Sequence, residues 1–127
     1  MVVELDELLV PDVAGWRAWL LEHHEASPGV WLVLHKKGGD VTSLAYPAAV
    51  EEALCFGWID GQARRRDDGS SFLRMTPRRP RSVWSPSNVE RVARLEREGR
   101  MHGSGRAAVR AAQSDGRWAR ATATPPD

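Results

Sequence analysis

Apolar and polar positions along the chain follow a helical spacing in some segments and a strand-like spacing in others. Residues 11–24 carry apolar side chains at helical intervals, which predicts a first helix beginning at Pro11. Residues 30–35 form a short, nearly continuous apolar run, which favours a strand covered on both faces. Residues 47–56 then predict a second helix that ends at Gly57, because glycine readily adopts the left-handed conformation found after helices.

The next segment predicts a β-hairpin with arms at residues 59–66 and 71–75. Its signal is Asp68-Gly69, a dipeptide that favours tight hairpin turns, between two runs of strand-like pattern. Side chains alternate between the two faces of a strand, so Arg64 and Arg66 should share one face and Arg65 should lie on the other.

Proline and arginine dominate residues 76–84, which predicts a loop or an irregular edge, because proline lacks the backbone donor that a sheet requires. Ser85 and Ser87 both offer N-caps for a third helix that ends before Gly99. A Gly-Ser-Gly linker at residues 103–105 separates it from a fourth helix over residues 106–118.

This order of elements predicts an α+β fold with a small antiparallel sheet, helices packed on one face, and a C-terminal helical pair. A chain of 127 residues, 42% of them hydrophobic, suits one domain with a real core. We therefore predict a single domain over residues 1–118 and a disordered tail over residues 119–127.

The composition narrows the possible chemistry. Cys55 is the one cysteine, so neither an internal disulfide nor a cysteine-based zinc site can form. The four histidines are scattered, and we predict neither a metal site nor a cofactor. The sequence has no export signal and no apolar run of about 20 residues, so we expect a cytoplasmic protein without membrane insertion.

Charge divides the chain into an acidic first half and a basic second half. Residues 1–60 carry ten acidic and three basic side chains, whereas residues 61–127 carry fifteen basic and seven acidic ones. Three arginines fall within four residues beside Trp84, and guanidinium groups bind carboxylates and phosphates well. This pattern favours a groove for an anionic or aromatic small molecule, with these candidate residues: Trp58, Asp60, Arg78, Arg79, Arg81, Ser82, Trp84, Ser85 and Asn88.

Other interpretations of these residues stay open. The loop arginines can instead pair with Asp60, Glu51 or Glu52, and Trp58 can fill the core beneath the sheet. One alternative function is a nucleic-acid-binding module that uses the loop arginines together with Arg64, Arg65, Arg66 and Arg74. Another is an enzyme in which Asp60 acts as acid or base.

Two motifs in this order carry a family resemblance: Gly57-Trp58-Ile59-Asp60-Gly61 and Ser82-Val83-Trp84-Ser85. With Thr76-Pro77-Arg78 and Gly99-Arg100-Met101, they resemble the YdeI/OmpD-associated, or bacteriocin-protection, family of bacteria. The resemblance implies a non-catalytic role in stress or toxin tolerance and, at fold level, similarity to YjbR and frataxin-like domains. The family is sometimes described as periplasmic, whereas the missing export signal favours the cytoplasm.

Overall fold

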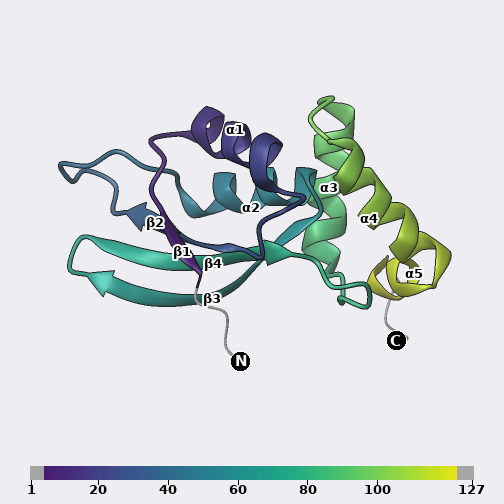
Figure 1. Cartoon of the computed structure of the whole chain (residues 1–127). Coiled ribbons are helices and arrows are strands. Elements are labelled where there is room, and N and C mark those ends of the chain that lie inside the picture. The colour runs from purple at the N-terminus through teal and green to yellow at the C-terminus, as the bar shows by residue number, and fades with distance from the viewer. Residues whose placement is uncertain (1–4, 123–127) are drawn as a thin grey trace, which may run out of the picture.

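The computed structural model describes residues 5–122, which form four strands and five helices (Figure 1). The elements in chain order are β1 (Asp6–Leu8), α1 (Val13–His23), β2 (Val30–His35), α2 (Tyr46–Cys55), β3 (Trp58–Asp67), β4 (Ser70–Pro77), α3 (Pro86–Arg97), α4 (Gly103–Ser114) and α5 (Arg117–Thr122). The α+β class and the C-terminal helical pair are confirmed. Within residues 5–122, every helix falls short of the length and apolarity needed to span a membrane.

The sheet has the strand order β1-β2-β4-β3. The predicted hairpin is present as β3 and β4, and β2 pairs antiparallel with β4. The sheet is mixed rather than purely antiparallel, because β1 joins the other side of β2 in parallel. Its three residues carry no strand pattern of their own, so only the tertiary pairing reveals this edge strand.

The core lies between one face of the sheet and the helices α1 and α2, which cover that face (Figure 1). Trp16 and Trp58 fill its centre, with 0% and 1% of their surface exposed. Both indole N–H groups reach backbone oxygens, of Ala49 at 3.1 Å and of His24 at 3.4 Å. These two rings therefore enter the interior without leaving their indole donors unsatisfied.

The C-terminal region departs from the predicted pattern at two glycine positions. Residues 103–105 are not a linker but the first turn of α4, which His102 caps by accepting from the backbone N–H of Ser104 at 3.2 Å. The predicted helix over residues 106–118 is interrupted at Gly116, whose φ of 87° ends the α-helical conformation.

The helix α5 also corrects the predicted disordered tail. It extends to Thr122, so residues 119–122 are ordered, and Ala121 is 92% buried, with 8% of its surface exposed. Burial of this small side chain and contact between Trp118 and Trp84 hold the short helix against the domain. The remaining predicted tail, residues 123–127, lies outside the described residues.

Cys55 at the end of α2 is expected to be chemically inert in the folded protein. It is 0% exposed, and burial, followed by the nearby charge of Glu52, raises the pKa of its thiol to about 11. Since the thiolate is the reactive form, iodoacetamide at about pH 8 should leave native Cys55 unmodified. Mass spectrometry should show full alkylation in concentrated guanidinium, and rapid alkylation without denaturant would contradict the expectation.

Candidate anion-binding site

The densest group of arginines surrounds Trp84, in the loop between β4 and α3. Trp84 is 3% exposed. The guanidinium carbon of Arg78 lies 3.6 Å from its ring centroid, and the Trp118 ring packs edge-on at 5.1 Å between centroids. The prediction that one face of the Trp84 indole is free is therefore wrong. Arg78 and Trp118 already occupy the positions that a stacking ligand would need.

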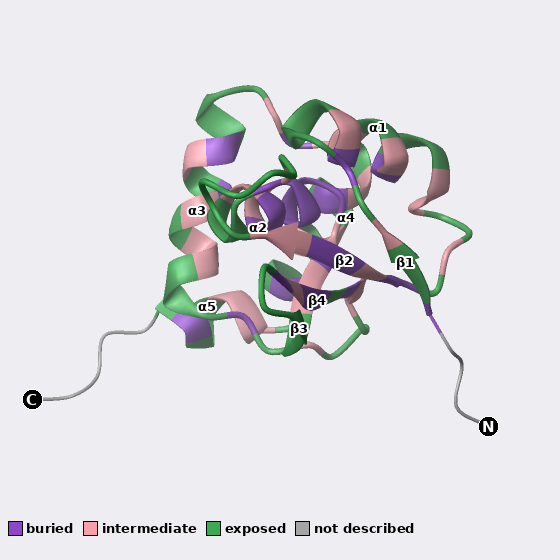
Figure 2. Cartoon of the chain, turned by 90° about the vertical axis from the view of Figure 1, so that its left-hand side faces the viewer, coloured by how far each residue is buried: buried purple, intermediate pink, exposed green. Residues whose placement is uncertain are grey.

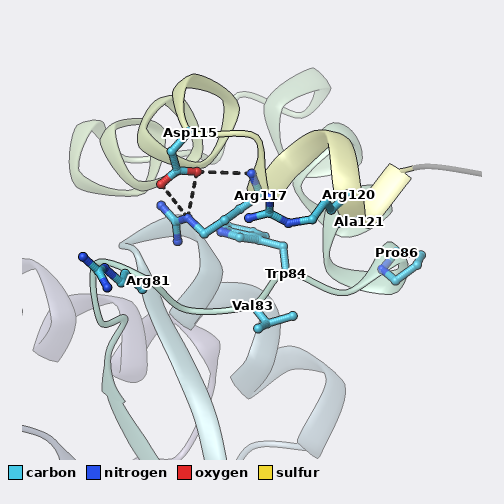
Figure 3. A pocket seen from close by; sticks show the side chains of 8 residues that line it. All are labelled: Arg81, Val83, Trp84, Pro86, Asp115, Arg117, Arg120 and Ala121. Atoms are coloured by element: carbon cyan, nitrogen blue, oxygen red, sulfur yellow. Dashed lines mark hydrogen bonds and ion pairs between the residues drawn. The ribbon is translucent and has the colours of Figure 1, made fainter.

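A pocket of about 520 Å³ opens on one side of Trp84, between the loop and α5 (Figure 3). Its lining comprises Arg81, Val83, Trp84, Pro86, Asp115, Arg117, Arg120 and Ala121. In Figure 3, Arg81 and Arg120 stand on opposite sides of the pocket, with Arg117 and the indole between them. Arg81 and Arg120 are both exposed. Neither side chain forms a hydrogen bond or an ion pair with another described residue.

Arg117 is the structural centre of this pocket. Its Nε lies 2.8 Å from the Asp115 carboxylate, and its Nη1 donates to the backbone oxygen of Ser82 at 2.9 Å. The contact with Ser82 joins α5 to the loop that carries Arg81, and the contact with Asp115 joins α5 to the end of α4. Asp115 is the one carboxylate in the described lining, so it offsets one of three positive charges.

A smaller cavity of about 240 Å³ lies beside Arg78 and shares Trp84 and Arg117 with the larger pocket. The Nη1 of Arg78 donates to the Ser82 hydroxyl at 2.9 Å, whereas its Nε and Nη2 are buried without a partner in the described structure. Burial, followed by repulsion from Arg117, lowers the pKa of Arg78 to about 10. The described lining of this cavity includes no carboxylate, although Arg78 belongs to it and has two donors without partners.

The structure brings some predicted groove residues together and separates others. Arg78, Arg79, Arg81, Ser82 and Trp84 line the two cavities.

Four predicted groove residues serve other purposes. Trp58 is a core residue, so its predicted place in the groove is wrong. Asp60 accepts a hydrogen bond from the Tyr46 hydroxyl at 2.7 Å and lines neither cavity. Ser85 caps α3 by accepting from the backbone N–H of Asn88 at 3.1 Å, and the Asn88 side chain accepts from Arg91 at 2.9 Å.

The alternative pairing of the loop arginines with Glu51 and Glu52 does not occur. Glu52 binds Arg17 and Arg100, whereas Glu51 pairs with Arg94 on α3. Glu51 and Glu52 are therefore paired with arginines that lie outside the loop between β4 and α3. In the described part of the chain, His, Cys, Asp and Glu side chains nowhere gather in a group of three that would hold a metal ion.

Comparison with known proteins gives one match. The family model described as "Domain of unknown function (DUF8412)" matches residues 8–108. The matched range includes the arginine-rich loop and ends before Asp115, Arg117 and Arg120. No curated protein and no solved structure matches the chain.

Proposed function

We propose that this chain, which belongs to the DUF8412 family, is a binding domain for a small anionic molecule held beside Trp84. The observation that carries the proposal is the Arg78 guanidinium, two of whose nitrogens are buried and unpartnered in the described structure. Arg81 and Arg120 add two charges without carboxylate partners across the neighbouring pocket. A bound carboxylate or phosphate would supply the missing acceptors.

The free energy of burying charge favours an anion-binding role for Arg78 over a role in packing alone. A desolvated guanidinium without an anion is unfavourable, as the lowered pKa of Arg78 reflects. Contact with Trp84 recovers only part of that cost, since a cation–π contact contributes about 0.5–2 kcal/mol. An anion that accepts from Nε and Nη2 would offset the remainder. The larger pocket, at about 520 Å³, is the size of a metabolite site.

The ligand we propose is anionic and need not be aromatic. Trp84 contributes a wall rather than a stacking platform, because Arg78 and Trp118 cover its indole. The resemblance to the bacteriocin-protection family adds a role in stress or toxin tolerance, which stays a prediction. Asp60 does not line either cavity, so the proposal assigns no catalytic residue.

Calorimetric titration with inorganic phosphate and with citrate tests the proposal. We expect saturable binding to the wild type and a loss of about tenfold or more in affinity for Arg81→Gln/Arg120→Gln. Each charged hydrogen bond contributes on the order of 1.5–3 kcal/mol. The matched control is Arg97→Gln, because Arg97 is exposed on α3 and lines neither cavity. Equal loss in the control, or no binding of either anion at millimolar concentration, would overturn the proposal.

A further inference from the structure

The sheet face opposite α1 and α2 is a second surface rich in arginine and aromatic side chains. None of the described helices covers it (Figures 1 and 2). Val33 of β2 lies beside Phe72 of β4, and Phe72 in turn lies beside Arg64 of β3. Val33 and Phe72 are buried, yet neither belongs to the core cluster on the other face. This outer sheet face therefore has an apolar layer of its own.

Guanidinium groups form the outer layer of this face. The Arg64 guanidinium carbon lies 4.3 Å from the Trp31 ring centroid and 5.3 Å from that of Phe72. Arg66 lies 5.9 Å from the Phe72 centroid, and the two aromatic rings meet edge-on at 5.9 Å. Arg74 is the cross-strand neighbour of Trp31, which places a further charge on the same face.

The charges on the outer sheet face are incompletely neutralised. Arg64 and Arg74 are exposed and form no ion pair or side-chain hydrogen bond with the described residues. Arg66 pairs with Asp67 at 3.0 Å. Glu7, which neighbours Trp31 on the edge strand β1, places a further carboxylate at this face. The surface thus joins stacked guanidinium planes to two free positive charges.

We propose that the outer sheet face binds single-stranded nucleic acid. Unpaired bases stack on arginine planes, which Arg64 and Arg66 present above the rings of Trp31 and Phe72. Phosphates pair with arginines, so one partner uses both properties of these side chains. Bases in a duplex are already stacked on one another, so a face that offers stacking favours an unpaired strand. Three adjacent strands span roughly 10–14 Å, enough for about two or three stacked bases.

This surface is separate from the pocket beside Trp84. Arg65 lies on the same strand as Arg64 but on the opposite face, where it pairs with Asp68 and lines another pocket. Arg78 and Arg81 belong to the loop after β4 and do not reach the outer face. The nucleic-acid surface therefore uses Arg64, Arg66 and Arg74 and excludes the loop arginines.

Fluorescence anisotropy with labelled oligo-uridylate and oligo-thymidylate tests this surface. We expect binding that weakens steeply with added salt and falls about tenfold or more in Arg64→Gln/Arg74→Gln. Arg65→Gln is the matched control, because it removes the same charge from the same strand on the opposite face. Both variants change exposed side chains, and circular dichroism checks that each remains folded.

The possible outcomes separate this proposal from its rivals. Unchanged binding by Arg81→Gln/Arg120→Gln supports a site distinct from the anion pocket, and loss of binding there overturns it. Equal loss in Arg65→Gln overturns it as general charge attraction. Equal affinity for a duplex of the same length, or for a poly-glutamate peptide, rules out single-strand recognition. No binding in low salt to either oligonucleotide also overturns the proposal.

Discussion

Replacing Gly105 with alanine should destabilise the domain by about 3 kcal/mol or more, at the upper end of overpacking effects. A Cβ at this position would lie 2.2 Å from the backbone oxygen of Cys55 and 2.6 Å from its carbonyl carbon. Both are main-chain atoms at the end of α2, so no side-chain rotation can relieve the overlap. The helix α4 would have to move away from α2.

That movement would also break the hydrogen bonds that join the two helices. The backbone N–H of His102 donates to the backbone oxygen of Cys55 at 2.9 Å, and the Ser104 hydroxyl donates to the backbone oxygen of Phe56 at 3.0 Å. Urea denaturation of Gly105→Ala should show a lower midpoint with a similar slope. A shift within experimental error of wild type would show that the helices do not need this close approach.

Gly103→Ala is the matched control, on the first turn of the same helix. A Cβ at Gly103 would meet nothing within 4 Å. Alanine also lowers the backbone entropy of the unfolded chain and favours the helix, so this variant should be neutral or slightly stabilising. A similar loss of stability in both variants would mean that α4 is sensitive to any change in its first turn, and not specifically to packing at Gly105.

Local signals in the sequence were enough to predict much of the fold. The Asp68-Gly69 turn identified the hairpin, and Gly57, whose φ is 77°, identified the end of α2. The Gly-Ser-Gly segment was misleading for a physical reason. Gly105 permits close helix packing rather than a turn, and only the contact with Cys55 reveals which role applies.

The candidate site was predictable in part. Clustering in the sequence drew attention to Arg78, Arg79 and Arg81, and these do line the cavities beside Trp84. Arg117 and Arg120 were missed, because nothing local links them to a loop 35 residues earlier. That link is the hydrogen bond from Arg117 to the backbone of Ser82, a product of tertiary packing.

The covered indole of Trp84 also lay beyond sequence reasoning. A tryptophan beside several arginines has the same local pattern whether its ring is open to a ligand or already stacked. Here Arg78 itself occupies one face. Trp31 and Phe72, which support the Arg64 guanidinium on the outer sheet face, were not predicted as site residues.

Removing both arginines that bind Glu52 should cost about 3–5 kcal/mol at neutral pH, the range for a stranded buried charge. Glu52 is 1% exposed, and its two oxygens lie 2.7 Å from Arg17 and 2.6 Å from Arg100. In Arg17→Met/Arg100→Met the carboxylate would keep its burial and lose its nearest positive charges. Urea denaturation near pH 7 should show the lower free energy of unfolding.

A triple variant, Arg17→Met/Glu52→Met/Arg100→Met, separates the stranded charge from the lost packing. Methionine at all three positions removes every charge of the cluster and keeps apolar side chains of similar length, so most of the lost stability should return. If the triple variant is as unstable as the double variant, the arginines stabilise the domain through their other contacts. Two such contacts are the hydrogen bond from Arg17 to the backbone of Arg100 and the stacking of Arg17 over Phe56.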